Sequence, residues 1–169
     1  MSTQPICKNC RKPKASFNCG ICQDDICKSC TQFLDEESFA FKKSVPAELK
    51  HSTYCSICFT DKVATPLDEY NETMANAREI IIYSKDQTRL TRLLKRKEEP
   101  YFVYNCVDQE EAVLKMSFYA VEGNFNALID VALTSKKVIV GSHKKLIWDG
   151  TAVPITIDPK EIRGHMGDE

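Results

Sequence analysis

Cys7-Lys-Asn-Cys10, Cys19-Gly-Ile-Cys22, Cys27-Lys-Ser-Cys30 and Cys55-Ser-Ile-Cys58 form four Cys-x-x-Cys pairs in the first third of a 169-residue chain. Two residues between ligands allow one tight turn to point both sulfurs at a single ion, so four pairs supply two tetrahedral four-thiolate sites. No cysteine of this segment is left over. The pattern therefore predicts two bound metal ions. We expect zinc, although a set of four thiolates does not by itself distinguish zinc from iron.

The spacing between the pairs favours an interleaved arrangement. Eight, four and twenty-four residues separate successive pairs, and the four residues between Cys22 and Cys27 are too few for two well-separated consecutive sites. If the first and third pairs share one ion and the second and fourth share the other, the short gap is accommodated. The spacing therefore favours a cross-brace.

The alternative to metal binding is a set of disulfides. The chain starts Met-Ser-Thr-Gln-Pro-Ile-Cys, without an apolar core of signal-peptide length, so we expect a cytoplasmic protein, in which paired cysteines are more often metal ligands than bridges. No uninterrupted apolar run approaches 18 residues. The ninth cysteine, Cys106, lies in an apolar stretch and is expected to be a buried small side chain without a reactive role.

The expected ligand set argues against catalysis at the metal. A catalytic zinc keeps one coordination position open and commonly uses His or carboxylate, whereas all-thiolate sites are closed. His51 precedes Cys55 by four residues and could replace a thiolate, but eight cysteines already suffice. No nucleophile–base pair or carboxylate dyad stands out elsewhere. We therefore expect no enzyme activity, with metal that holds the fold together.

Composition and pattern changes divide the chain into two domains. We expect a zinc module over residues 1–62, a linker over 63–77, an α+β domain over 78–158 and a flexible tail over 159–169. Residues 31–54 are expected to be the least constrained part of the first domain, a surface loop. Thr65-Pro66 disfavours helix at Thr65, and the polar residues 68–77 are expected as a short helix or linker.

The second domain alternates between strand and helix patterns. Strands are expected at 79–84 and 101–107, and helices at 86–97 and 109–122, with Gly123 ending the second helix. Four shorter strands follow, at 128–133, 137–140, 145–148 and 151–157, with a turn at Gly141-Ser142. This order indicates a compact α+β fold with a mainly antiparallel sheet.

The cysteine segment resembles the FYVE-type zinc finger, a treble-clef-like cross-brace module, over residues 5–62. The gap of four residues and the local sequences Cys22-Gln-Asp-Asp-Ile-Cys27-Lys-Ser-Cys30 and Tyr54-Cys55-Ser-Ile-Cys58-Phe carry the resemblance more closely than RING or LIM spacing would. A RING-like ubiquitin ligase would also require a ligand His in the central pairs. The FYVE resemblance implies one site of Cys7, Cys10, Cys27 and Cys30, and another of Cys19, Cys22, Cys55 and Cys58.

The residues that FYVE domains use for phosphatidylinositol 3-phosphate are missing. Ala15-Ser-Phe-Asn18 and Ser52-Thr-Tyr54 stand where the family has basic residues, so a phosphate would lack charge-assisted donors. Lys12 and Lys14 could substitute in part, as could a basic helix over 86–97. A membrane-associated adaptor for anionic phosphoinositides is therefore the alternative function.

The second domain resembles, more faintly, the YbjQ-type heavy-metal-binding family. Ala120-Val-Glu-Gly123-Asn-Phe-Asn126-Ala127 and Trp148-Asp-Gly150-Thr-Ala-Val153 carry this resemblance, over residues 78–158. It implies assembly into a homo-oligomer, while no cysteine–histidine cluster in this range supports metal binding there: only Cys106 and His143 occur.

We therefore expect a non-enzymatic zinc protein that acts in protein interaction or scaffolding. A protein partner is expected through the finger or the sheet domain. Nucleic acid is not expected, because the net charge of the chain is −1.

Overall fold

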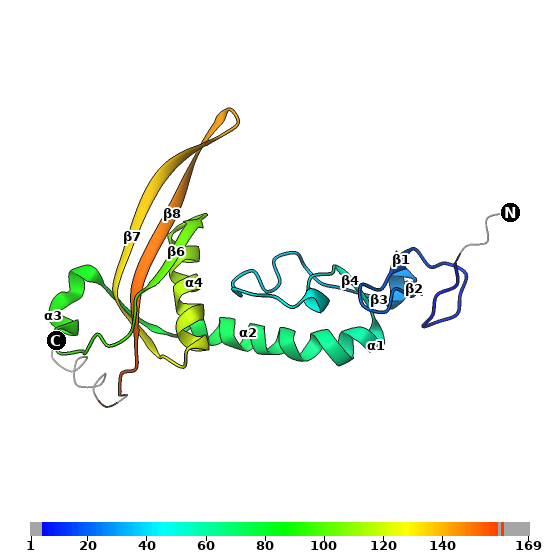
Figure 1. Cartoon of the computed structure of the whole chain (residues 1–169), viewed down its shortest axis with the longest axis horizontal. Helices are drawn as coiled ribbons and strands as arrows, with labels where there is room; N and C mark the ends of the chain where they lie inside the picture. Colours follow the sequence, from blue (N-terminus) through cyan, green and yellow to red (C-terminus); the bar gives the residue numbers. More distant parts are fainter. Residues whose placement is uncertain (1–4, 159, 161–169) are drawn as a thin grey trace. The chain divides into compact units, whose positions relative to one another are not determined.

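A computed structural model describes residues 5–158 and 160 (Figure 1). The chain forms two compact units, Met1–Glu72 and Thr73–Glu169. The boundary between the units, after Glu72, lies within the helix α2 (Ala64–Arg78) and within the range 63–77 given to the linker from the sequence. The expected tail over 159–169, apart from Lys160, lies outside the described residues. We describe each unit by itself.

The first unit contains very short strands. Strands β1 (Phe17–Asn18) and β2 (Asp25–Ile26) pair antiparallel, as do β3 (Thr31–Phe33) and β4 (Thr53–Cys55). Two one-turn 3₁₀ helices accompany them, η1 (Lys28–Cys30) and η2 (Ala47–Leu49). Such short ladders make few backbone hydrogen bonds, so this unit depends on other interactions to hold its fold.

Residues 31–54 are better ordered than the sequence indicated. Phe39, 1% exposed, packs edge-on against Tyr70 with ring centroids 5.3 Å apart. The hydroxyl of buried Tyr54 donates to the Glu48 carbonyl (3.0 Å), and Leu49 is also buried. The expectation of a loosely constrained loop was therefore wrong. These apolar residues follow neither a helical nor a strand period, so the pattern could not reveal the small core that they form.

A continuous helical run covers residues 56–78. It consists of α1 (Ser56–Cys58), the π-helical turn η3 (Phe59–Val63) and α2 (Ala64–Arg78). The helix continues through Thr65-Pro66, so the expected break at Thr65 was wrong. In an α-helix the ring of Pro66 would crowd the carbonyl four residues earlier. The wider π turn directly before it, in which the Ala64 N–H donates to the Phe59 carbonyl, changes the spacing there.

The second unit is built on one four-stranded sheet with the order β5-β7-β8-β6. Its strands are β5 (Ile81–Ser84), β6 (Tyr101–Cys106), β7 (Ala127–Val140) and β8 (His143–Ile155). Strands β5 and β7 are parallel, and the other two pairings are antiparallel. The α+β class and the mainly antiparallel sheet that the sequence predicted are both confirmed.

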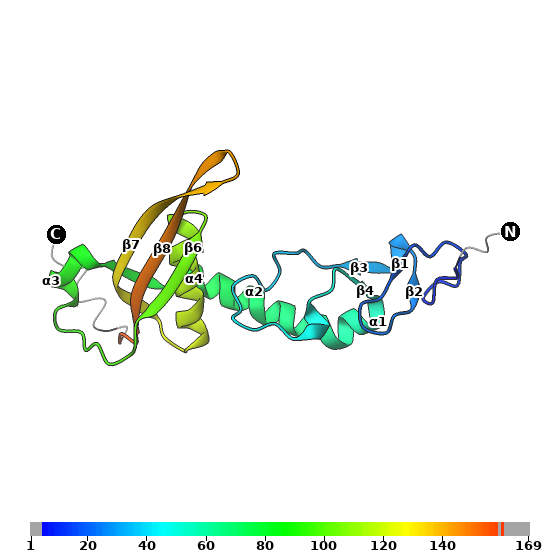
Figure 2. The same ribbon diagram turned by 45° about the horizontal axis from the view of Figure 1, so that its top comes forward.

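Strands β7 and β8 are each continuous where the sequence predicted two strands. They form one long hairpin around Gly141-Ser142, and its far end continues past the last residue pair of β6, Cys106 with Trp148 (Figure 2). Thr134 to Lys136 did not end a strand because this ribbon is solvent-exposed on its outer half, where polar residues fit. The turn at Gly141 is confirmed, and its φ of +62° suits glycine.

The helix expected over 86–97 is much shorter. Only the 3₁₀ turn η4 (Lys85–Gln87) and the four-residue helix α3 (Thr88–Thr91) form, followed by irregular chain. Leu94 packs against the sheet but Leu93 is 84% exposed, so the leucines do not form one buried stripe. The side chain of Leu90 lies outside the described residues. The expected basic amphipathic helix is therefore absent from the part of the chain that the structure describes.

Helix α4 (Gln109–Glu122) packs on one face of the sheet and has the boundaries the sequence predicted. The Asp108 carboxylate accepts from the Glu111 N–H (2.7 Å), and the Glu111 carboxylate accepts from the Val107 N–H. This reciprocal cap starts the helix, and Gly123 follows its last residue as predicted. Met116 and Ala112 are fully buried against Val103 and Leu128 of the sheet.

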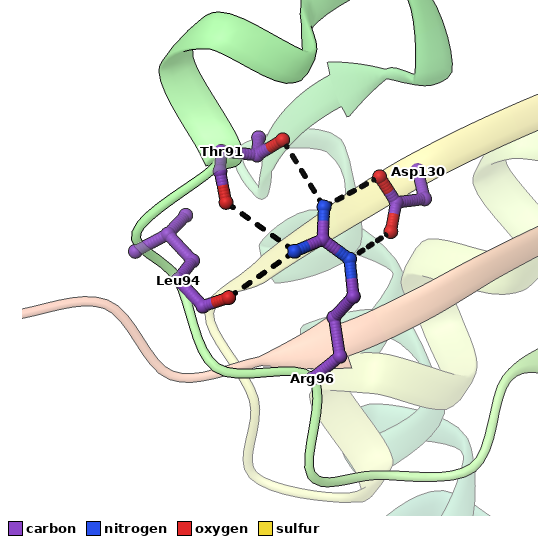
Figure 3. A network of polar contacts seen from close by, with 4 residues as sticks. All are labelled: Thr91, Leu94, Arg96 and Asp130. Atoms are coloured by element: carbon purple, nitrogen blue, oxygen red, sulfur yellow. Dashed lines mark hydrogen bonds and ion pairs between the residues drawn. The ribbon is translucent and has the colours of Figure 1, made fainter.

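The opposite face of the sheet carries a second, smaller core. Ile129 and Ile155 are buried there, with Leu94 of the segment after α3 packed against them. An arginine fastens this segment to the sheet. The Arg96 guanidinium donates to both carboxylate oxygens of Asp130 on β7 and also to the Thr91 and Leu94 carbonyls (Figure 3).

No described helix of the chain has the length and apolar character needed to cross a bilayer.

Candidate metal centres

The first two cysteine pairs sit in turns of the same design. The Arg11 N–H donates to the Cys7 carbonyl (2.7 Å), and the Gln23 N–H donates to the Cys19 carbonyl (3.0 Å). Arg11 and Gln23, each directly after the second cysteine of its pair, adopt φ values of +57° and +63°. Such left-handed residues are uncommon outside glycine, and here they close a turn that presents both sulfurs of a pair in one direction.

The other two pairs lie where a helical turn begins. Cys27 precedes the 3₁₀ turn that ends at Cys30, and the Cys30 N–H donates to the Cys27 carbonyl (2.9 Å). Cys55 caps α1, and its sulfur accepts from the Cys58 N–H (3.4 Å). In both cases the helical turn brings the second cysteine of the pair back toward the first.

The structure brings the eight sulfurs together in two groups of four. The first and third pairs meet in one group and the second and fourth in the other, and within each group all sulfurs lie within 4.8 Å of one another. The members are Cys7, Cys10, Cys27 and Cys30 (site 1), and Cys19, Cys22, Cys55 and Cys58 (site 2). These are the two sets that the sequence led us to expect.

The sulfur separations fit a tetrahedral ion. Sulfurs placed about 2.3 Å from a central zinc lie about 3.8 Å apart at the corners of a tetrahedron. The Cys10–Cys27 and Cys22–Cys55 sulfurs are 3.7 and 3.9 Å apart. A disulfide requires about 2.05 Å, and all nine cysteines are free thiols in the structure. The residues present therefore fit a closed four-thiolate metal site twice.

The protonation balance at site 1 also calls for a cation. Backbone N–H groups, first that of Cys10, lower the pKa of Cys7, and the Ser29 hydroxyl lowers the pKa of Cys27 to about 6. The pKa of Cys30 is raised to about 12, first by its hydrogen bond with Cys27 and then by burial. Some of these thiols lose their proton readily and others do not, because four thiolates this close together repel one another. A divalent ion removes this conflict.

Site 2 has the same division. Burial alone would raise the pKa of Cys19, but the backbone N–H groups of Cys55, Cys22 and Ile21 outweigh it and lower this pKa to about 6. Burial raises the pKa of Cys22, and it raises that of Cys58 to about 11. Each site therefore combines at least one easily ionised thiol with others that need a cation to ionise.

One short β-ladder connects the two sites. Strand β3 begins directly after Cys30 of site 1, and β4 ends at Cys55 of site 2; Thr31 pairs with Cys55 across the ladder. Apolar side chains, chiefly Ile26 with Phe17 beside it, pack against the cysteines. The two ions would thus share one small core, and loss of either would loosen the ladder that positions the other.

His51 belongs to neither group of sulfurs. Its imidazole lies over Gly20, where an added Cβ would come within 2.2 Å of the ring, and the Gly20 N–H donates to the Thr53 carbonyl (2.9 Å). Glycine inside the second pair therefore permits close packing of the backbone under His51. The sequence offered His51 as a spare ligand, whereas the structure gives it a packing role.

Several residues that contact the cysteines or join their turns were not predicted from the sequence. The Ser29 hydroxyl lies 3.2 Å from the Cys27 sulfur, and Lys8 forms an ion pair with Asp24, which joins the turn of the first pair to the hairpin of the second. Only the position of Ser29 between two ligands could have signalled its role. Among the described residues, the second unit contains no third cluster of metal-ligating side chains, and Cys106 is buried, as expected.

Comparison of the chain with protein-family models, with curated proteins and with solved structures finds no match.

Proposed function

We propose that the chain is a non-enzymatic zinc protein whose first unit is a double-zinc, FYVE-like cross-brace module that presents a surface to a protein partner. The grouping of eight sulfurs into two tetrahedral sets carries this proposal. Each set offers four thiolates, which fill the coordination shell of a zinc ion and leave no position for substrate. The metal then stabilises the fold, in a reducing compartment such as the cytoplasm that keeps the thiols available.

Solvent-exposed apolar side chains of the first unit suggest where a partner could bind. Ile6, Phe33 and Ile57 are 62%, 54% and 63% exposed, respectively, and each lies within three residues of a ligand cysteine. A metal-stabilised unit can expose such residues because its stability depends less on burying them. The faint YbjQ-like resemblance of the second unit adds a second proposal, that this unit supports a homo-oligomer.

The phosphoinositide adaptor remains the alternative, with less support. Lys12 and Lys14 are exposed, but the basic helix on which that hypothesis also relied is reduced to the four residues of α3. Sedimentation with phosphoinositide vesicles at low salt tests it directly. The alternative predicts binding that Lys12→Gln with Lys14→Gln abolishes, and the scaffold proposal predicts no binding.

X-ray absorption at the zinc edge tests the closed sites. We expect a shell of four sulfurs at about 2.3 Å for both ions and no nitrogen or oxygen ligand. A mixed shell, or an open position filled by water, would contradict a purely structural role. Proximity labelling in the native cell tests the partner surface: Ile57→Ser should lose labelled proteins that wild type and Ile139→Ser retain.

A further inference from the structure

The sheet of the second unit has one face covered by α4 and an opposite face that is only partly covered. Along β8, Gly150 and Ala152 face α4, so Thr151 between them faces the other way. Phe102 pairs with Thr151, which places its side chain on the face away from α4. On that face, Leu94 packs over Ile129, Val153 and Ile155. We call the rest of the face, which includes Phe102 and Thr151, the open face.

Two aromatic rings lie on the open face without cover. Phe102 and Tyr104, two residues apart on the edge strand β6, stack with ring planes 5° from parallel and centroids 6.5 Å apart. They are 55% and 59% exposed. Aromatic pairs of this kind are normally buried, because each ring carries a large apolar area. A stacked pair held in water on a rigid strand offers flat surfaces to a ligand that is itself flat.

Cations are concentrated in two segments of this unit. Residues 85–97 and 134–148 hold ten of the twelve Lys and Arg residues of 73–158, and only one of its eleven acidic residues. The first segment packs on the same side of the sheet as the rings, through Leu94. Four of the acidic residues instead lie on or next to α4, on the opposite face: Asp108, Glu110, Glu111 and Glu122. The cations of the unit are therefore clustered in these two segments, although the formal charge of residues 73–158 is close to zero.

The second basic segment is the outer part of the β7–β8 hairpin, which extends past β6 (Figure 2). Lys136 is held by Asp149 at 2.8 Å, whereas Lys137, Lys144 and Lys145 are exposed and have no acidic partner among the described residues. By the register of the hairpin, Lys145 shares the open face with Thr151. By the same register Lys144, and Lys137 opposite Leu146, lie on the other face, so Lys145 is the one of these three lysines on the open face and the outer hairpin carries cations on both faces.

We propose that the open face binds single-stranded nucleic acid, with bases stacked on Phe102 and Tyr104 and the phosphate backbone running toward Lys145 and the basic outer hairpin. Exposed aromatic rings beside a basic track are the combination that single strands require, since every base has a flat face and every linkage carries a charge. An anionic membrane or an acidic peptide would account for the lysines, but neither makes use of two parallel aromatic faces.

Fluorescence anisotropy of the full-length zinc-loaded chain with a labelled oligothymidylate of roughly twelve nucleotides tests this proposal. Phe102→Leu with Tyr104→Leu keeps apolar side chains on β6 but removes both flat faces. We expect affinity to fall about 25-fold or more, about fivefold for each ring. The matched control is Val107→Ala, which shortens an equally exposed apolar side chain of the same unit and should leave affinity unchanged.

The salt dependence of the affinity tests the contribution of the lysines. Replacing Lys145 by Gln should flatten the dependence of log affinity on log salt by about 0.7, the contribution of one lost phosphate contact on a single strand. Lys50→Gln, at an exposed lysine of the first unit, is the control and should not change the slope. The fluorescence of the single tryptophan, Trp148, reports whether each variant of the second unit is folded.

Three results would overturn the proposal. The first is absence of binding at low salt. The second is unchanged affinity in the folded leucine double variant, because binding would then be charge attraction alone. The third is sedimentation with phosphatidylserine vesicles without any oligonucleotide binding, which would assign the basic hairpin to a membrane surface.

Discussion

Replacement of Cys19 by serine removes a buried metal ligand and so tests whether bound metal holds the first unit folded. Cys19 is fully buried and contributes one of the four sulfurs of site 2. A structural zinc ion supplies about 10–16 kcal/mol of apparent binding free energy. A whole small domain is stable by only about 5–15 kcal/mol, so the first unit cannot stay folded without most of that contribution. We expect Cys19→Ser to lower the zinc content from two ions per chain to at most one and to unfold much of the first unit.

Cys106→Ser is the matched control, because Cys106 is also a buried cysteine, 2% exposed, but belongs to neither site. Burying a hydroxyl there costs about 1–3 kcal/mol, and both ions should remain. Native mass spectrometry gives the ion count, and limited proteolysis reports the first unit. Trp148 fluorescence follows the second unit, which should melt as in wild type after Cys19→Ser. Two retained ions in Cys19→Ser, or a lost ion in Cys106→Ser, would refute the reasoning.

Three further variants test other parts of the account. Gly20→Ala should weaken zinc retention against a chelator because its methyl group would collide with His51, and adding His51→Ala should restore it; failure of that rescue would contradict the packing role of the histidine. Asp130→Asn should lower the melting temperature of the second unit near neutral pH. The Arg96 guanidinium holds the pKa of this carboxyl below its ordinary 3.8 in the folded chain, so the carboxylate stabilises fully above that pH and progressively less as the pH falls through the folded-state pKa. The difference in melting temperature between wild type and Asp130→Asn should therefore shrink in acid, and a difference that grows would exclude this ion pair as its source. Met116→Ala, at a fully buried position under α4, should cost the second unit about 2–5 kcal/mol by urea unfolding followed at Trp148, and a loss below about 1 kcal/mol would mean that the core is misassigned.

The sequence predicted the sulfur clusters well because ligand spacing is a local property with few geometric solutions. The gap between Cys22 and Cys27 favoured interleaving before any coordinates, and the structure groups the sulfurs in that way. The residues that tune the sites were not visible. Ser29 is an ordinary residue for a turn, and nothing in the sequence near Gly20 shows that His51, 31 positions later, lies against it.

In the second unit, sequence patterns predicted one helix correctly and another wrongly. Helix α4 was predicted because its stripe is regular and its cap residues are local, whereas the 86–97 helix was not formed beyond Thr91. There the chain gains more from Leu94 packing on the sheet and from Arg96 bonding Asp130 than from further helical turns. The net charge of the chain likewise concealed how strongly the cations cluster in residues 85–97 and 134–148.

Native mass spectrometry of the purified whole chain, before and after a strong zinc chelator, tests the central claim most directly. The account predicts two zinc ions per chain, eight cysteines that become open to alkylation only when both ions are gone, and loss of fold in the first unit at the same point. A chain that is well folded without any bound ion, or whose paired cysteines are joined as disulfides, would contradict it.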